Sequence, residues 1–230
     1  KEFTAHITAE QLQLQQLTNN RDFGNLSATI TAKGTIEKTK VLTAKAHADI
    51  NTRLYKSHLY RNIYADGAYS TQTGINANID IDDNYCHANI LAAYNLAKTQ
   101  KGGSIKANIQ DFNPQALGLI SKWEGITFSF FADGAFTGNN INNAKGHLNV
   151  NDFTMSDSTT TFRMNSLELT KDVDNGRQDI RLKSDFATLY AEGKFELQNI
   201  TNSITNAIYH RLPTLPGIYH TANTSNNINV

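Results

Sequence analysis

The stretch from Ile75 to Ile81 reads INANIDI, and this strict alternation of apolar and polar residues decides the fold class. Successive side chains of a β-strand point to opposite faces, so such a stretch has one apolar and one polar face. The same alternation recurs along most of the chain, from Leu26–Ala32 near its start to Leu189–Ala191 near its end. The pattern predicts an all-β protein of antiparallel strands, with one face of the sheet shielded and the other in water.

Turn and helix signals lie between these runs. Asp66-Gly67, Asp133-Gly134 and Asp174-Asn175-Gly176 are typical of hairpin turns, because such pairs adopt positive φ angles readily. Helical patterns occur in three short places, where we expect a few short helices. They are Glu10–Leu17, whose leucine spacing is ambiguous, Pro114–Ile120 after the capping residue Asn113, and Ile200–Leu212 with isoleucine at every fourth position.

An internal repeat organises the chain. Ala32–Asn51 and Ala132–Asn151 align without gaps at an offset of one hundred, with six of twenty positions identical, His47 and His147 among them. Upstream, Ala5–Ile7 and Ala107–Ile109 match, and a helical segment follows each. We therefore expect two tandem β repeats of about 100 residues, 1–103 and 104–199. An amphipathic helix and turn over 200–217 and a polar tail over 218–230, the possible start of another strand, would follow them.

Composition excludes several function classes. The chain has 21 Lys+Arg and 21 Asp+Glu residues, without the basic excess that nucleic-acid binding requires, so we expect no nucleic-acid partner. It opens at Lys1 without a signal peptide and has no apolar run long enough to span a membrane. These features favour an internal piece of a longer protein. The lone Cys86 excludes a disulfide within the chain and is typical of a small buried apolar residue.

No catalytic motif is found, so we expect no enzyme activity and no cofactor. Asp172–Gly176 resembles the start of a calcium loop, but Lys183 occupies the position where that loop needs a bidentate glutamate. His47 and His147 lack further ligands nearby in the sequence, and common ancestry of the repeats explains their recurrence, so we expect no metal site.

The apolar stripes allow two interpretations. They could form the closed core of a β-sandwich, which periodicity alone favours, or an open groove that holds acyl chains. The groove hypothesis assigns its lining to residues that lie centrally in the alternating stripes, namely Ile30, Ile79, Ile90, Phe128, Phe130, Val150 and Leu182.

The chain resembles the TamB family of envelope proteins (the translocation and assembly module subunit), within the larger group of AsmA-like proteins. The resemblance covers nearly the whole chain through loose strand–turn–strand phrases, and the sequence departs from the family in its lone cysteine and higher polarity. The phrases are Gly24–Gly34, Tyr60–Ile63, Asp66–Tyr69, Phe136–Ile141, Gly146–Phe153, Leu182–Phe186, Ala191–Gly193 and the helical segment Ile200–Leu212 with Pro213.

This resemblance implies an elongated, curved antiparallel sheet folded into a trough (a β-taco) with an apolar lining, and so favours the open groove. It implies a location in the periplasm of a Gram-negative bacterium, with the full-length protein anchored in the inner membrane. The implied role is phospholipid transport to the outer membrane, with acyl chains as ligand and an outer-membrane β-barrel protein as partner. The alternatives are a scaffold that helps β-barrel proteins assemble by β-augmentation, and a closed structural stalk.

Overall fold

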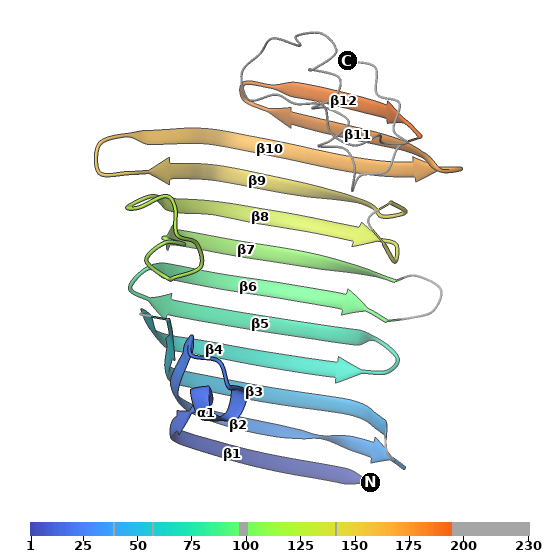
Figure 1. The fold of residues 1–230 in the computed structure, drawn as a ribbon. Helices are drawn as coiled ribbons and strands as arrows, with labels where there is room; N and C mark the ends of the chain where they lie inside the picture. Colours follow the sequence, from blue (N-terminus) through green and yellow to red (C-terminus); the bar gives the residue numbers. More distant parts are fainter. Residues whose placement is uncertain (39, 57, 97–100, 141, 195–230) are drawn as a thin grey trace.

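The structure is a computed structural model that describes residues 1–38, 40–56, 58–96, 101–140 and 142–194. It contains one short helix, α1 (Leu14–Thr18), and twelve strands that form a single antiparallel sheet in sequence order (Figure 1). The strands are β1 (Glu2–Gln13), β2 (Phe23–Glu37), β3 (Lys40–Tyr55), β4 (His58–Ser70), β5 (Gly74–Asp83), β6 (Cys86–Asn95), β7 (Gly102–Phe112), β8 (Thr127–Thr137), β9 (Lys145–Ser156), β10 (Thr161–Asp174), β11 (Arg177–Ser184) and β12 (Thr188–Gly193). The all-β, antiparallel prediction is confirmed.

The sheet is a simple meander, in which every strand pairs with the strands before and after it. The connection between β10 and β11 is the tight turn that the sequence predicted, with φ angles of 48° at Asn175 and 77° at Gly176. The predictions of turns at Asp66-Gly67 and Asp133-Gly134 are wrong. Asp66-Gly67 lies within β4 and Asp133-Gly134 within β8, and all four residues have partners on both neighbouring strands.

The helix predictions need correction. Pro114–Ile120 forms turns and no helix. Asn113 does act as the expected cap, since its side chain accepts a hydrogen bond from the Ala116 N–H at 2.9 Å. Gly118 then adopts a φ of 71°, which ends the turn before a second one can form. The first half of Glu10–Leu17 belongs to β1, and the second half is helical because α1 begins at Leu14. Ile200–Leu212 lies outside the described residues.

Strands β1 and β7 have the same kind of bulge near their C-terminal ends. Each strand has a bulge with a residue at positive φ, Gln11 or Asp111, whose N–H donates to a serine hydroxyl on the next strand. Those bonds, to Ser27 and Ser129, measure 3.1 and 3.0 Å. The serines are 102 positions apart, and with this offset the register makes Lys45, and not His47, the equivalent of His147.

The repeat therefore stays a prediction, with its alignment shifted by two residues after the bulge. The expected boundary between residues 103 and 104 falls inside β7, because that strand already begins at Gly102.

The buried core cluster is small and lies at the start of the central strand β6. It consists of Cys86, Ala88 and Leu117, with Ile81 and Phe112 packed against it. Among the described residues no large side chain is less than 2% exposed. The described strands are thus held by their ladder of backbone hydrogen bonds and by contacts between neighbouring strands, without the thick core of a β-sandwich in this part of the chain.

Candidate apolar face

Strand register places the apolar side chains on one side of the sheet, which we call the apolar face. Three rows cross this face, each with one residue per strand in direct cross-strand pairing. The end row is Phe3, Gly34, Ala44, Tyr69, Ile75, Tyr94, Gly103, Phe136, Gly146, Lys171, Ile180 and Ala191. The small row is Ala5, Ala32, Ala46, Gly67, Ala77, Ala92, Ile105, Gly134, Leu148, Leu169, Leu182 and Leu189. The isoleucine row is Ile7, Ile30, Ala48, Ala65, Ile79, Ile90, Ala107, Ala132, Val150 and Leu167.

The rows have complementary sizes over the first half of the sheet. From β1 to β6 the small row holds only alanine and glycine, while the isoleucine row beside it holds a large side chain on four of the six strands. A low path between larger side chains therefore runs across the strands. Since neighbouring strands lie about 4.8 Å apart, twelve strands extend this face over roughly 50 Å.

The apolar face is open within the described part of the chain. Ile7 is 56% exposed, Ile75 45%, Phe136 45% and Leu189 50%. A closed sandwich would bury these side chains against a second sheet. Isolated exposed aliphatic residues are common on proteins, but a contiguous apolar face of this extent is typical of a binding surface.

All seven residues predicted to line a groove lie on this face. Ile30, Ile79, Ile90 and Val150 belong to the isoleucine row, with Ile79 directly opposite Ile90, and Leu182 belongs to the small row. Phe130 and Phe128 lie beyond the isoleucine row on β8, where they pair with Ile109 and Phe112. Each of the seven side chains is half-buried. The structure thus places all seven on one face, spread from β2 to β11, and their contact with lipid remains a proposal.

Aromatic rings extend the apolar face past Phe128. Trp123 lies over Phe128 with ring centroids 5.7 Å apart, and Phe128 is 6.1 Å from Phe153. Phe162 and Phe186 continue this ladder at 6.3 and 5.9 Å across β10 and beyond β11. Sequence alternation alone missed the ladder, because bulges with positive φ at Asp111 and Asp152 reset which residues share a face.

The opposite face is polar. One of its rows reads His6, Thr31, His47, Asp66, Asn78, Leu91, Lys106, Asp133, Asn149, Glu168, Lys183 and Thr188. Cross-strand ion pairs on this face include Lys106–Asp133 at 3.3 Å and Lys145–Asp172 at 2.9 Å. These pairs are exposed, so each contributes little to the free energy of folding, and their charged groups make this face hydrophilic.

Both histidines singled out in the sequence lie on the polar face. His47 Nδ1 lies 2.8 Å from the Asp66 carboxylate, and His147 Nε2 lies 3.6 Å from Asp133. Within the described ranges, no group of three or more His, Cys, Asp or Glu side chains could hold a metal ion.

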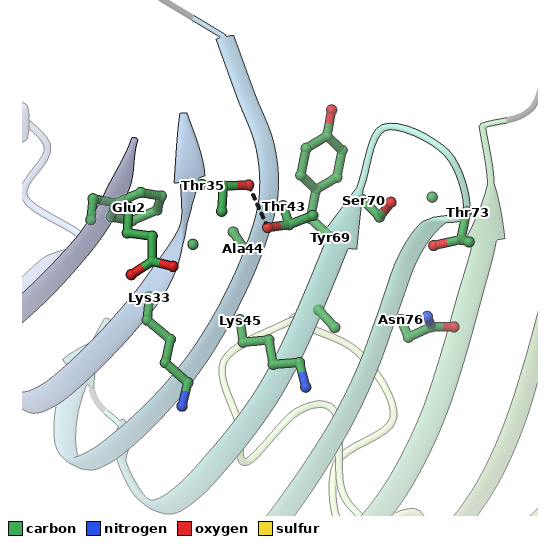
Figure 2. Close-up of a pocket in the computed structure, with 14 residues that line it drawn as sticks. Glu2, Lys33, Thr35, Thr43, Ala44, Lys45, Tyr69, Ser70, Thr73 and Asn76 are labelled. Carbon is green, nitrogen blue, oxygen red and sulfur yellow. Dashed lines mark hydrogen bonds between the residues drawn. The ribbon is translucent and has the colours of Figure 1, made fainter. Parts of the chain in front are cut away.

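A hollow of about 560 Å³ lies at the ends of β1–β5 (Figure 2). Its walls include Lys33 and Lys45, which are directly opposite each other on β2 and β3, and Tyr69 of the end row. Thr35 and Thr43 are joined there by a hydrogen bond of 2.8 Å between their hydroxyls. Its lining is mixed, and both lysines are exposed on a polar surface.

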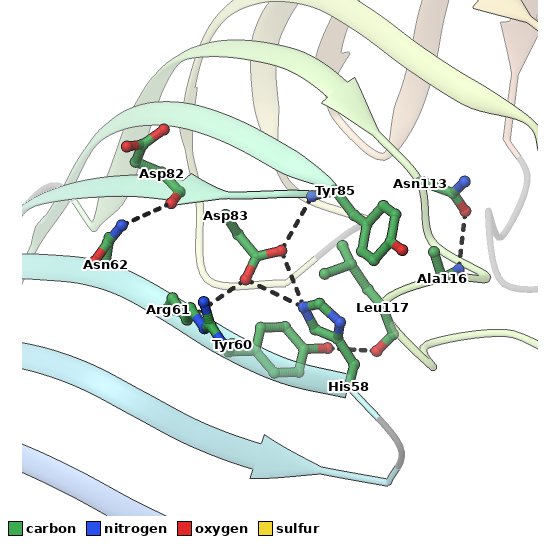
Figure 3. Close-up of polar contacts among 10 residues, drawn as sticks. All are labelled: His58, Tyr60, Arg61, Asn62, Asp82, Asp83, Tyr85, Asn113, Ala116 and Leu117. Atoms are coloured by element: carbon green, nitrogen blue, oxygen red, sulfur yellow. Dashed lines mark hydrogen bonds and ion pairs between the residues drawn. The ribbon is translucent and has the colours of Figure 1, made fainter.

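A buried polar cluster fixes the loop that follows β7 (Figure 3). The Asp83 carboxylate accepts hydrogen bonds from the backbone N–H groups of Arg61 and Tyr85 at 3.0 and 3.1 Å, and it lies 2.9 Å from His58 Nε2. The Tyr60 hydroxyl donates to the Leu117 carbonyl at 2.6 Å. These contacts hold Leu117 in the buried core cluster with Cys86 and Ala88. Buried polar groups with this many hydrogen bonds have a structural role.

Cys86 lies in that core beside the polar cluster. Burial, assisted by the negative charge of Asp83, raises the pKa of its thiol to about 11. The thiol is therefore protonated at neutral pH and is a poor nucleophile, which agrees with its role as a small buried residue.

A second hollow, of about 430 Å³, opens in the apolar face over β7–β10. Its floor contains Gly103, Gly134 and Gly146 from three adjacent strands, and its walls include Phe136 and Leu148. Sequence reasoning missed this feature because the glycines resemble turn signals. The cross-strand register, which the sequence does not give, places them next to one another.

Comparison with known proteins does not assign the chain to a family. No protein-family model, curated protein or solved structure matches the chain. Among the described residues, no helix has the length and apolarity needed to span a membrane.

Proposed function

We propose that the apolar face lines a trough that carries phospholipid acyl chains toward the outer membrane of a Gram-negative bacterium. The observation that supports this most strongly is the small row, which crosses all twelve strands without a polar residue on a face whose side chains are mostly half-buried or exposed. In this proposal the sheet curves around the face, as the resemblance to TamB-like envelope proteins implies. The chain then acts in the periplasm as part of a longer protein anchored in the inner membrane.

The physical task requires no chemistry. Exposing one methylene group to water costs about 0.8 kcal/mol, so an acyl chain that crosses an aqueous gap alone meets a large barrier. An apolar path that stays level from strand to strand removes this cost at each step. From β1 to β6 the small row provides room for a chain between larger side chains, and its alanines and glycines offer no polar side chain that would hold the chain in one place.

Neighbouring phenylalanines on opposite faces supply the test. Phe130 lies on the apolar face, whereas Phe131 is 46% exposed on the polar face. We expect Phe130→Lys in the full-length protein to make the outer membrane leaky to detergents and large antibiotics. Phe131→Lys, at equal protein level, should leave the membrane intact. Equal permeability of the two strains would contradict the proposal.

A second candidate function is a scaffold for β-barrel assembly. It rests on β1, a twelve-residue strand that pairs with β2 along only one of its edges among the described residues. A client strand could add to the free edge by backbone hydrogen bonds. A proline at Thr4 or Thr8 that removes donors from this edge should impair barrel assembly if the scaffold hypothesis holds, and should leave lipid transport unchanged.

A further inference from the structure

The hollow over β7–β10 differs from the rest of the apolar face because a charge lies in it. Lys171 lines this hollow and is the one charged residue in the three rows defined above. Its cross-strand partners are Gly146 and Ile180, so its stem lies among small and apolar side chains. A charged side chain among apolar neighbours costs free energy, and an apolar residue at this position would fit the pattern of the row.

The hydrogen bonds of Lys171 go to backbone carbonyls. Its Nζ donates hydrogen bonds to the backbone carbonyls of Ala144 at 2.5 Å and Asn142 at 3.3 Å. In the described part of the chain no carboxylate pairs with it, because the adjacent Asp172 points to the polar face and pairs with Lys145 at 2.9 Å. The two carbonyl groups orient the ammonium group but do not neutralise its charge. Its third N–H can donate to a bound anion.

The space beside this ammonium fits an alkyl chain. Gly103, Gly134 and Gly146 line the floor without side chains of their own, and Ile105, Leu148 and Leu169 form apolar walls. Its volume of about 430 Å³ is within the range of small-ligand sites. Apolar walls with the Lys171 ammonium group at the rim match a molecule with an apolar chain and one anionic end.

We propose that this hollow is a binding site for an anionic amphiphile, with the alkyl chain over the glycine floor and its phosphate or carboxylate on Lys171 Nζ. The inference rests on the proposed function, since it assumes that the apolar face accepts acyl chains, and it adds a position where a moving lipid pauses by its headgroup. A hydrogen bond between charged groups gives such a site a preference for anionic over neutral heads.

Calorimetric titration of the purified chain tests this with three probes kept below their micelle concentrations. Dodecyl phosphate and dodecanol share a chain and differ in charge, and inorganic phosphate has the charge without the chain. We expect dodecyl phosphate to bind about tenfold or more tightly than dodecanol, and inorganic phosphate to bind more weakly than either. Stronger binding of inorganic phosphate would identify a plain anion site and overturn the proposal.

Lys171→Met removes the charge and keeps a long apolar side chain. In this variant dodecyl phosphate should bind about as weakly as dodecanol, with dodecanol affinity unchanged, and Lys171→Arg should restore the preference. Lys106→Met, the matched control on the polar face outside the hollow, should behave like the unmodified chain. A preference that survives Lys171→Met would refute the site. If dodecanol itself does not bind the unmodified chain, the proposed function fails, and this outcome is distinct from the loss of the anion preference alone.

Discussion

Replacing Ile79 by lysine separates an open apolar face from a closed core. Ile79 is half-buried in the isoleucine row, between Ala65 on β4 and Ile90 on β6. On an open face the lysine stem can lie along the sheet while its ammonium group reaches water, so the loss is limited to part of the isoleucine burial, about 1 kcal/mol. In a closed core the same lysine would be an unpaired buried charge and would cost roughly 3–5 kcal/mol.

Thermal unfolding followed by circular dichroism distinguishes these magnitudes. For a chain of this size we expect Ile79→Lys to lower the Tm by about 2–4 °C with the β spectrum retained. Leu91→Lys is the matched control, because Leu91 is 47% exposed on the polar face of the neighbouring strand, and it should change the Tm by less than Ile79→Lys does. Loss of the cooperative transition in Ile79→Lys, with Leu91→Lys intact, would refute the open face at this position.

Two further predictions follow from packing and burial. A Cβ atom at Gly103 would lie 2.9 Å from both the Phe136 ring and the Ala93 carbonyl oxygen. A Cβ atom at Gly67 would lie 3.9 Å from its nearest neighbour, the Asn76 carbonyl oxygen. Gly103→Ala should therefore destabilise the chain by about 1–3 kcal/mol in urea unfolding, and Gly67→Ala should not. The Cys86 thiol, with its pKa raised to about 11, should react with iodoacetamide far more slowly at pH 8 than in the unfolded chain. Its rate should rise as the pH approaches 11, and a fast reaction in the folded state at pH 8 would contradict its burial.

Local alternation was enough to predict the strands, because a period of two needs no knowledge of the partner strand. Ile75–Ile81 lies within β5 with its isoleucines on one face, as the pattern indicated. The bulges were not predictable in the same way. A positive φ at Asn62 and Asp152 changes which residues share a face, and neither residue type nor spacing marks these positions in the sequence.

Glycine was the least reliable signal. Gly134 follows an aspartate, as turn glycines often do, but it lies in mid-strand, where a Cβ atom would come within 3.1 Å of the Leu148 side chain. Its small size therefore serves the neighbouring strand and not a turn. The hollow that Lys171 lines contains three glycines from adjacent strands, so it could be found only once the strand pairing was known.

The central claim is that lipid contacts one face of this sheet, and site-specific photocrosslinking tests it most directly. The photoreactive residue p-benzoylphenylalanine would replace Ile90 on the apolar face and, in a separate strain, Leu91 on the polar face of the same strand. After irradiation of cells that make the full-length protein, mass spectrometry of the purified protein would reveal phospholipid adducts. We predict adducts from residue 90 and none from residue 91. Adducts from both positions alike, or from residue 91 alone, would contradict the account.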